Sequence, residues 1–330
     1  MMGTRTSISP AALAVFAFAL ASALGGCGTD GDRHSTPPSS LTTIPADSSP
    51  PPKTEAAPAV ARVESEVIGE RRFEINVPAG YDESRPVPLV VVLHGYTGTG
   101  SGAKAYFQLE AEARKRGFLT VYPEGTEDSS GNQFWNATDA CCQFTPSEAD
   151  DSAYLTALID RVEEKFSVDP KRVFFVGHSN GGFMSYRMAC EHADRIAAIV
   201  SVAGATFEDL AACKPVQPVS IVQVHGTSDT VINFAGGSIL GRSYPAALRS
   251  VTTWAAYNGC DAVPQPGVGA AQRDLDDAVS GNDSSVTAFA GCAPGVAVEL
   301  WTIEGGSHEP KLTAAFASSI MDVLLAHPKP

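Results

Sequence analysis

The chain has 330 residues, of which 44% are hydrophobic and 8% are aromatic, a composition that excludes a wholly disordered protein. Acidic side chains outnumber basic ones by 37 to 23, so the net charge is −14. This charge disfavours nucleic acid and anionic membrane surfaces as partners. No apolar run reaches the roughly 20 residues that a membrane-spanning helix needs. We therefore expect an acidic protein with a well-packed core.

The N-terminus has the pattern of an export signal. Arg5 precedes an apolar stretch at residues 11–24, and small residues follow. A basic segment, an apolar segment and a small-residue cleavage site predict a secretory signal peptide, here residues 1–26. The sequence Leu24–Cys27 (Leu-Gly-Gly-Cys) resembles a bacterial lipobox, which implies lipidation of Cys27 after cleavage. We expect an exported protein that is either tethered to a membrane by this lipid or secreted.

Residues 27–61 are rich in Pro, Ser and Thr. A segment of this composition cannot bury a core, and it is typical of an extended, semi-rigid tether. The pattern changes at residue 62, and no internal repeat follows. We therefore predict one folded domain over residues 62–330.

Six cysteines follow Cys27, an even number that suggests disulfides in an exported chain. Metal ligation is the alternative, but the chain has no Cys-x-x-Cys or His-x-x-x-His spacing, so we expect no metal. Two pairs would each close a local excursion, and the remaining two cysteines are then left for each other, although other pairings stay open. The favoured pairs are Cys190–Cys213, Cys260–Cys292 and Cys141–Cys142.

Strand and helix patterns alternate along the predicted domain. Residues 72–77 alternate between polar and apolar, which predicts a half-exposed strand, whereas the apolar run at 89–93 predicts a strand buried on both faces. The other predicted elements, in chain order, are a helix at 103–116, a strand at 118–122, a helix at 155–166, a strand at 172–176, a helix at 182–192, strands at 196–202 and 219–224, a helix at 244–257, a strand at 296–303 and a helix at 313–326. This alternation predicts an α/β fold with a mostly parallel central sheet and helices on both faces.

Residues 177–181 read Gly-His-Ser-Asn-Gly and match the pattern Gly-x-Ser-x-Gly. The pentapeptide follows a predicted strand and precedes a predicted helix. This is the setting of the nucleophile elbow, in which the flanking glycines allow a sharp turn that exposes the serine hydroxyl. We therefore predict that Ser179 is a nucleophile.

A serine nucleophile needs a base and an acid that orients the base. Asp229 and His308 each follow a predicted strand, and with Ser179 they have the chain order of an α/β-hydrolase. The carboxyl ends of parallel strands meet at one edge of a sheet, so we expect the three side chains to lie together. The other histidines are less suited: two begin His-Gly turns, one should point away from the serine, and three lie in the tether or on helix faces. They are His94, His225, His178, His34, His192 and His327.

The loop after the strand at 89–93 reads His-Gly-Tyr-Thr. We expect the backbone N–H of Tyr96 in this loop, together with that of Asn180, to form an oxyanion hole. The glycine-rich stretch at 95–104 is not a phosphate-binding loop, because Lys104 neither follows a glycine nor precedes Ser or Thr. No nucleotide or other cofactor is expected.

Several segments together resemble the polyhydroxybutyrate depolymerase and feruloyl esterase group of secreted α/β-hydrolases, over about residues 66–325. They are 94–97, 122–125, 135–136, 141–142, 150–151, 177–184, 225–229 and 305–308. The resemblance implies an α/β-hydrolase fold with Ser179 as nucleophile, His308 as base and then acid, and Asp229 as the orienting acid. It places the oxyanion N–H groups at Tyr96 and Asn180.

The substrate would lie beside these groups, and Trp135 and Tyr96 are the candidates to line its acyl pocket. One position departs from the group: Glu309-Pro310 follows His308 where the group tends to have Trp-Pro. This departure removes an aromatic platform from the side of the base.

These features predict an exported serine esterase that cleaves carboxylic esters through an acyl-enzyme. Its substrates would be feruloyl or acetyl esters of plant-wall polysaccharide, or short-chain polyhydroxyalkanoate. One alternative is a serine peptidase of the prolyl-oligopeptidase type, which shares the fold and the order of the triad but commonly has a large additional domain. The other is a catalytically silent surface-binding protein, to which an intact Ser-Asp-His set would be of no use.

Overall fold

The computed structural model describes residues 62–144, 148–266 and 273–330. The expected signal peptide, the tether and Cys27 lie outside the described residues. Among the helices that the structure does describe, none combines the length and the apolar character that crossing a bilayer requires.

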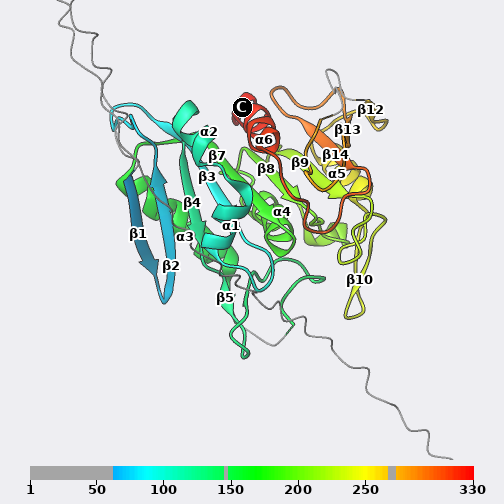
Figure 1. Cartoon of the computed structure of the whole chain (residues 1–330), viewed down its shortest axis with the longest axis horizontal. Coiled ribbons are helices and arrows are strands. Elements are labelled where there is room, and N and C mark those ends of the chain that lie inside the picture. The colour runs from blue at the N-terminus through cyan, green and yellow to red at the C-terminus, as the bar shows by residue number, and fades with distance from the viewer. Residues whose placement is uncertain (1–61, 145–147, 267–272) are drawn as a thin grey trace, which may run out of the picture. The chain divides into compact units, whose positions relative to one another are not determined.

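A 10-stranded sheet forms the centre of the domain, with the strand order β1-β2-β4-β3-β7-β8-β9-β14-β13-β12 (Figure 1). Six adjacent strands are parallel and carry the continuous apolar runs of the sequence: β4 (Leu119–Pro123), β3 (Val87–Leu93), β7 (Val168–His178), β8 (Ala198–Val202), β9 (Ser220–Gly226) and β14 (Val298–Ile303). Antiparallel strands complete both edges: β1 (Arg62–Ile68), β2 (Arg71–Val77), β13 (Ser284–Ala288) and β12 (Gln265–Pro266). The α/β fold with a mostly parallel sheet is confirmed.

Helices cover both faces of the sheet, and each face has its own apolar core. One core contains buried side chains of α3 (Asp151–Lys165), α4 (Asn180–Glu191) and α5 (Ala247–Tyr257). The other contains those of α1 (Gly100–Phe107), α2 (Glu110–Arg116) and α6 (Ala314–Ala326). Because the parallel strands are buried on both faces, their carboxyl ends are the part of the sheet that is open to a ligand.

The predicted helix at 103–116 is wrong as a single element. The chain forms two helices, because Gln108 adopts a left-handed conformation with φ of 50° and its N–H caps the first helix at Lys104 O. Leu109 is fully buried, and the chain bends there to place it in the core before the second helix begins. The apolar spacing alone did not reveal this break.

Two hairpins project at the end of the sheet where the parallel strands finish (Figure 1). One is formed by β5 (Thr126–Glu127) and β6 (Gln133–Phe134), and the other by β10 (Gly237–Ile239) and β11 (Arg242–Tyr244). A short 3-10 helix at Leu210–Ala212 lies between β8 and β9 in the chain. None of these short elements was predicted, because each has too few residues for a periodic pattern.

Three disulfides join the pairs of cysteines that the sequence analysis favoured: Cys190–Cys213, Cys260–Cys292 and Cys141–Cys142. The first closes a sequence separation of 23 residues and attaches the last turn of α4 to the segment that precedes β9. Loop closure of that length stabilises a fold by about 3 kcal/mol on the chain-entropy account. The helix that follows Ser179 is thus covalently anchored near its far end.

Candidate active site

The turn between β7 and α4 is the predicted nucleophile elbow. Ser179 has a φ of 52°, which is unusual for a residue with a side chain. A Cβ atom at Gly177 would lie 2.1 Å from the carbonyl oxygen of Gly181, and one at Gly181 would lie 2.5 Å from that of Leu93. Only glycine fits at these two positions, so the Gly-x-Ser-x-Gly pattern is a steric requirement of the turn that exposes Ser179.

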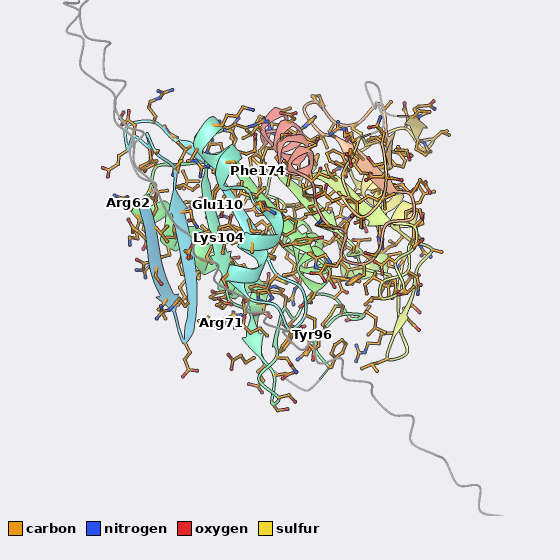
Figure 2. All side chains as sticks on the ribbon, viewed as in Figure 1. Arg62, Arg71, Tyr96, Lys104, Glu110 and Phe174 are labelled. Atoms are coloured by element: carbon orange, nitrogen blue, oxygen red, sulfur yellow. A yellow bond between two sulfur atoms is a disulfide. The ribbon has the colours of Figure 1, made fainter. Side chains whose placement is uncertain are left out.

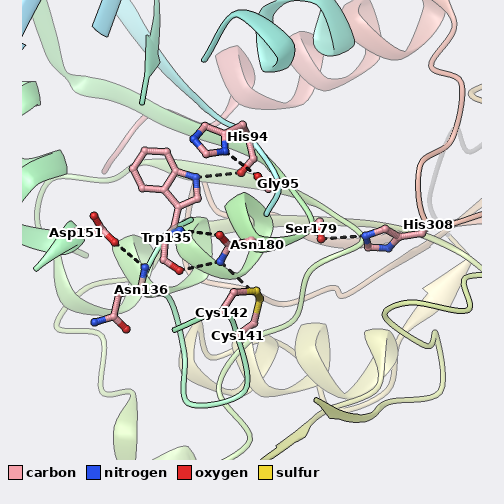
Figure 3. The surroundings of a disulfide bond; sticks show 10 residues. All are labelled: His94, Gly95, Trp135, Asn136, Cys141, Cys142, Asp151, Ser179, Asn180 and His308. Atoms are coloured by element: carbon pink, nitrogen blue, oxygen red, sulfur yellow. Dashed lines mark hydrogen bonds between the residues drawn. A yellow bond between two sulfur atoms is a disulfide. The ribbon is translucent and has the colours of Figure 1, made fainter. Parts of the chain in front are cut away.

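The structure brings the three predicted catalytic side chains together. His308 Nε2 lies 2.9 Å from Ser179 Oγ, a contact drawn in Figure 3, and His308 Nδ1 lies 2.8 Å from Asp229 Oδ2. Asp229 Oδ1 accepts hydrogen bonds from the backbone N–H groups of Val231 and Ile232, both at 2.8 Å. These distances form a continuous hydrogen-bonded path from the serine hydroxyl to a fixed carboxylate.

Asp229 is 4% exposed, and burial by itself would raise the pKa of its carboxyl group. Hydrogen bonds from His225 and His308 and from the N–H of Ile232 outweigh that effect and hold the pKa of Asp229 well below its usual range. Asp229 is therefore ionised at neutral pH, as an acid that orients and stabilises a histidine must be.

The loops that carry Asp229 and His308 are joined by backbone contacts. The N–H of Thr227 donates to Ile303 O, and the N–H of Ser228 donates to Gly306 O, both at 2.9 Å. A Cβ atom at Gly226 would lie 2.2 Å from Gly306 O, so the approach of the two loops depends on glycine. Adjacent parallel strands, β9 and β14, thus place the acid and the base side by side.

His178 lines the active-site cavity but does not contact the serine hydroxyl. Its Nε2–H donates to the carbonyl oxygen of His308 at 2.9 Å, and the two rings are 5.0 Å apart. Burial, reinforced by the neighbouring His308, lowers the pKa of His178 to about 4. His178 is therefore neutral at pH 7 and supports the backbone of the candidate base.

One predicted oxyanion donor, Asn180, directly follows Ser179, and the other, Tyr96, lines the same cavity as Ser179. Figure 2 labels Tyr96, which lies at the end of the sheet from which the hairpins project. The N–H groups of the neighbouring residues already have partners: Thr97 donates to Gln133 O at 2.8 Å, and Ser179 donates to Val202 O at 2.7 Å. Within the described ranges of the chain, the backbone N–H groups of Tyr96 and Asn180 have no hydrogen-bond partner, as an oxyanion donor requires.

A cavity of about 320 Å³ opens beside Ser179 and His308. Its wall is formed by the loop after β3, by α1 and by the residue after the base, and it includes Tyr96, Tyr106, Phe107 and Glu309. Glu309, at the position where the sequence departs from the resembling group, is exposed at the cavity wall. The lining is partly aromatic and carries one carboxylate.

The expectation that Trp135 lines this cavity is not met. Trp135 is 0% exposed and does not belong to the cavity wall. Its ring packs 4.9 Å from that of His94, beneath the loop that carries Tyr96. An aromatic residue near a site had suggested substrate contact, but this one is part of the core.

The sequence analysis did not single out Gln223, which lies in the apolar run of β9 and is 0% exposed. Its Oε1 accepts from Tyr186 Oη at 2.9 Å, and its Nε2 contacts His225 Nδ1 at 3.2 Å. His225 in turn contacts Asp229 Oδ2 at 3.2 Å. A lone amide in an otherwise apolar strand was the available signal, because a buried amide needs buried partners.

A parallel α/β sheet with a hydrogen-bonded Ser-His-Asp set at its strand ends defines the class of α/β-hydrolases. Throughout the described ranges, no group of three or more His, Cys, Asp or Glu side chains is placed to hold a metal ion. A family model with the description "Putative esterase" matches residues 65–262, more than half of the chain. The chain belongs to this esterase family.

Two curated relatives are feruloyl esterases. Feruloyl esterase B of Piromyces equi is 29% identical over 246 residues, which cover 72% of this chain but 42% of that protein. Feruloyl esterase D of Neurospora crassa is 28% identical over 241 residues, which cover 73% of this chain and 74% of that protein. The chain thus spans less than half the length of the first relative and about three quarters of the second.

Among solved structures, an acetyl xylan esterase from Aspergillus awamori superposes with a TM-score of 0.54 at 16% sequence identity. The match covers 80% of this chain and 99% of the other. At that identity the likeness concerns the fold, which agrees with the α/β-hydrolase topology of the sheet.

Proposed function

We propose that the protein is an exported serine esterase in which Ser179, His308 and Asp229 form the catalytic triad. The observation that carries this proposal is the path from Ser179 Oγ to His308 Nε2 at 2.9 Å and from His308 Nδ1 to Asp229 Oδ2 at 2.8 Å. Family membership supports an ester as the bond that is cleaved, in preference to the peptide bond of the prolyl-oligopeptidase alternative.

The reaction follows from this geometry. As Ser179 Oγ attacks the ester carbonyl carbon, its proton moves to His308 Nε2, and ionised Asp229 stabilises the imidazolium through Nδ1–H. The carbonyl oxygen becomes an anion between the N–H groups of Tyr96 and Asn180. Each oxyanion donor of this kind typically contributes on the order of 10²–10³ in rate.

Collapse of the tetrahedral intermediate breaks the bond to the alcohol, and His308 returns the proton from Nε2 to the leaving oxygen. The acyl group then remains on Ser179 as an ester. Water, deprotonated by the same nitrogen, attacks this acyl-enzyme, and His308 returns that proton to Ser179 Oγ as the bond to the acyl group breaks and the acid leaves. Besides the ester and water, these steps use only groups of Ser179, His308, Asp229, Tyr96 and Asn180.

For the acyl group we propose a feruloyl or acetyl unit esterified to plant-wall polysaccharide, with a short-chain polyhydroxyalkanoate as the alternative substrate. The two feruloyl esterases among the relatives support the first choice. Tyr96, Tyr106 and Phe107 supply aromatic surface to the cavity beside Ser179, which suits a planar or short acyl chain.

The polysaccharide would extend past the vicinal disulfide, which joins the adjacent residues Cys141 and Cys142. Two further hollows, of about 270 and 260 Å³, share Thr138, Asp139, Phe207 and Arg242 in their walls. An aromatic face beside charged and hydroxyl groups can hold a sugar ring by stacking and hydrogen bonds. Phe207→Ala should therefore raise KM for acetylated xylan several-fold and leave KM for p-nitrophenyl acetate unchanged.

The test of the catalytic assignment compares the purified protein with its Ser179→Ala variant on p-nitrophenyl acetate, methyl ferulate, acetylated xylan and short-chain polyhydroxybutyrate. Turnover of at least one substrate should fall by about 10⁴–10⁶ in the variant, because the triad acts as a unit. The substrate with the highest kcat/KM identifies the acyl class. A variant that keeps most of its activity would overturn the assignment, and inactivity of a folded wild-type protein on all four esters would favour a silent binder.

We also propose that the protein acts outside the cytoplasm, tethered through lipid on Cys27. The lipobox-like sequence and the Pro/Ser/Thr-rich segment after it support this location. Cells that express the full chain should carry it in the membrane fraction, and Cys27→Ala should move it to the soluble exported fraction. An unchanged distribution would remove the lipid anchor from the proposal.

A further inference from the structure

Trp135 is fully buried, and its backbone N–H, its carbonyl oxygen and its indole N–H all form hydrogen bonds. Its backbone N–H donates to Asn180 Oδ1 at 2.7 Å, and its carbonyl oxygen accepts from Asn180 Nδ2 at 2.8 Å. Its indole Nε1–H donates to the carbonyl oxygen of His94 at 3.0 Å. Figure 3 shows the indole of Trp135 beside His94 and the main chain of Trp135 beside Asn180.

The two partners of Trp135 belong to the two segments that supply the oxyanion donors. Asn180 provides one N–H itself, at the start of α4. His94 begins the loop that leads to Tyr96, which provides the other. The two segments are far apart in sequence, and within the described chain Trp135 is the residue whose side chain and main chain hydrogen-bond to both of them.

The segment that carries Trp135 is also held in place by Asp151. The N–H of Asn136 donates to Asp151 Oδ2 at 2.6 Å, and Asp151 is 0% exposed. The other carboxylate oxygen of Asp151 accepts from Thr126 Oγ1 at 2.9 Å and pairs with Arg71. Trp135 therefore rests on a buried, fully bonded carboxylate and cannot shift without breaking that network.

Asn180 is restrained on its remaining side by the vicinal disulfide. Its Nδ2 lies 3.5 Å from Cys141 Sγ, in addition to its bond with Trp135 O (Figure 3). The side-chain amide of Asn180 thus has a fixed orientation, and so has the first peptide of α4. A donor that does not reorganise during the reaction is what stabilisation of an oxyanion requires.

We propose that Trp135 is a positioning residue that sets the separation between the two oxyanion N–H groups, a role that rests on the proposed esterase function. Trp135 does not contact the substrate. It acts through the His94 carbonyl on the Tyr96 loop and through the Asn180 amide on the start of α4. Misplacing a catalytic group by about 1 Å can cost on the order of 10² in rate, so loss of this link should lower kcat.

The test is Trp135→Phe, which keeps a buried aromatic ring but removes the indole N–H. The matched control is Trp254→Phe, since Trp254 is equally buried and donates its Nε1–H to Thr206 Oγ1 at 3.0 Å, outside the catalytic residues. We expect kcat on p-nitrophenyl acetate to fall about 10- to 100-fold in the first variant with KM little changed, and to stay within about two-fold of wild type in the control.

A second readout separates positioning from general stability. A trifluoromethyl ketone forms a tetrahedral adduct with the serine, and its oxygen occupies the oxyanion hole. The inhibition constant should rise in Trp135→Phe by about the factor by which kcat falls, and stay unchanged in Trp254→Phe. Equal losses of thermal stability in both variants, with kcat and the inhibition constant of Trp135→Phe at wild-type values, would overturn the proposal.

Asn180→Ala provides an independent route if Trp135→Phe does not fold. It removes both side-chain bonds to Trp135 and retains the backbone N–H of residue 180. It should lower kcat and weaken the ketone by similar factors, and wild-type values in this variant would also contradict the proposed role. Failure of the esterase assignment is a different result, because the wild-type enzyme would then show no activity that depends on Ser179.

Discussion

His94 and His225 each precede a glycine at a strand end, but a different ring nitrogen carries the proton in each. Each stands at the carboxyl end of a buried parallel strand, precedes a glycine and is almost fully buried. His94 donates from Nδ1 to Gly95 O at 2.7 Å and accepts at Nε2 from the N–H of Gly125 at 3.0 Å. His225 donates from Nε2 to Ile232 O at 2.7 Å. A carbonyl can only accept and an amide N–H can only donate, so these partners determine which nitrogen carries the proton in each ring.

The two histidines consequently organise different halves of the site. The Gly95 carbonyl belongs to the same peptide unit as the N–H of Tyr96, so the bond from His94 orients that oxyanion donor. His225 instead shares its Nε2–H between Ile232 O at 2.7 Å and Asp229 Oδ2 at 3.2 Å, and so contacts the acid of the triad. One half of the site is thus built from backbone dipoles, and the other from hydrogen bonds between side chains that can ionise.

Among conservative substitutions, we expect the largest effect at Asp229, which contacts both His225 and the base His308. Asp229→Asn keeps the size of the side chain but removes the charge, and an amide NH₂ directed at His308 would favour the wrong tautomer of the ring. We expect kcat/KM on p-nitrophenyl acetate to fall by about 10⁴. A loss below ten-fold would mean that Asp229 does not orient the base.

The His94 half can be tested with two amides that mimic its two nitrogens. His94→Asn keeps a donor near the position of Nδ1, whereas His94→Gln keeps an acceptor near that of Nε2. Because the Nδ1 bond orients the Tyr96 peptide, we expect kcat to fall about 10²-fold in the Gln variant and about 10-fold or less in the Asn variant. Steady-state kinetics of both variants decide the matter, and the reverse order would contradict this role of His94.

The corresponding change at His225 should cost less. Asp229 keeps the N–H groups of Val231 and Ile232 when the ring is removed, so one contact of several is lost. We expect kcat to fall about 10-fold in His225→Ala, and His225→Gln, which retains a donor near Nε2, to remain within about three-fold of wild type. If His225→Ala lost as much activity as Asp229→Asn, the carboxylate would depend on this ring alone.

The smallest effect is expected on the stability of the fold at acidic pH, through His94. Burial lowers the pKa of His94 from its ordinary value of 6.5 to about 4. Between these values the unfolded chain binds a proton that the folded protein does not, so His94 contributes stability above pH 6.5 that is lost as the pH falls toward 4. The slope for one such group is about 1.4 kcal/mol per pH unit.

Urea unfolding at several pH values across that interval measures this contribution. The dependence of the unfolding free energy on pH should be less steep in His94→Asn than in the wild type by about that slope. His178 titrates in the same interval in both proteins, so its contribution cancels in the comparison. Identical slopes would show that His94 is not neutral in the folded protein.

The sequence predicted the parallel part of the fold because buried strands are continuous apolar runs and helices have a distinct period. It predicted the positions of Ser179, Asp229 and His308 because each follows such a run. It did not predict β1, whose exposed Val63 and Val67 lie on an edge strand and follow no simple pattern, or β13, which lies in a segment of weak periodicity. Edge strands depend on neighbours that are distant in sequence.

The parts of the site that could not be predicted depend on hydrogen bonds between segments far apart in the chain. The aromatic character of Trp135 pointed to a pocket, but whether an indole faces a ligand or the core depends on packing that no local pattern encodes. Because His94 and His225 each begin a His-Gly turn, the sequence favoured a structural role for both over that of a base. Which group each ring binds became visible only with Gly125 and Ile232 in place.

The backbone of Ser179 has a consequence for how this enzyme could be made more robust. A residue with a side chain at a φ of 52° lies in a sparsely populated region, which costs on the order of 1–3 kcal/mol. Ser179→Gly would relieve that conformation and should yield a protein that melts at a higher temperature but does not turn over. Selection for heat resistance alone would therefore favour loss of the nucleophile, and a thermostable active descendant must gain its stability at positions away from the elbow.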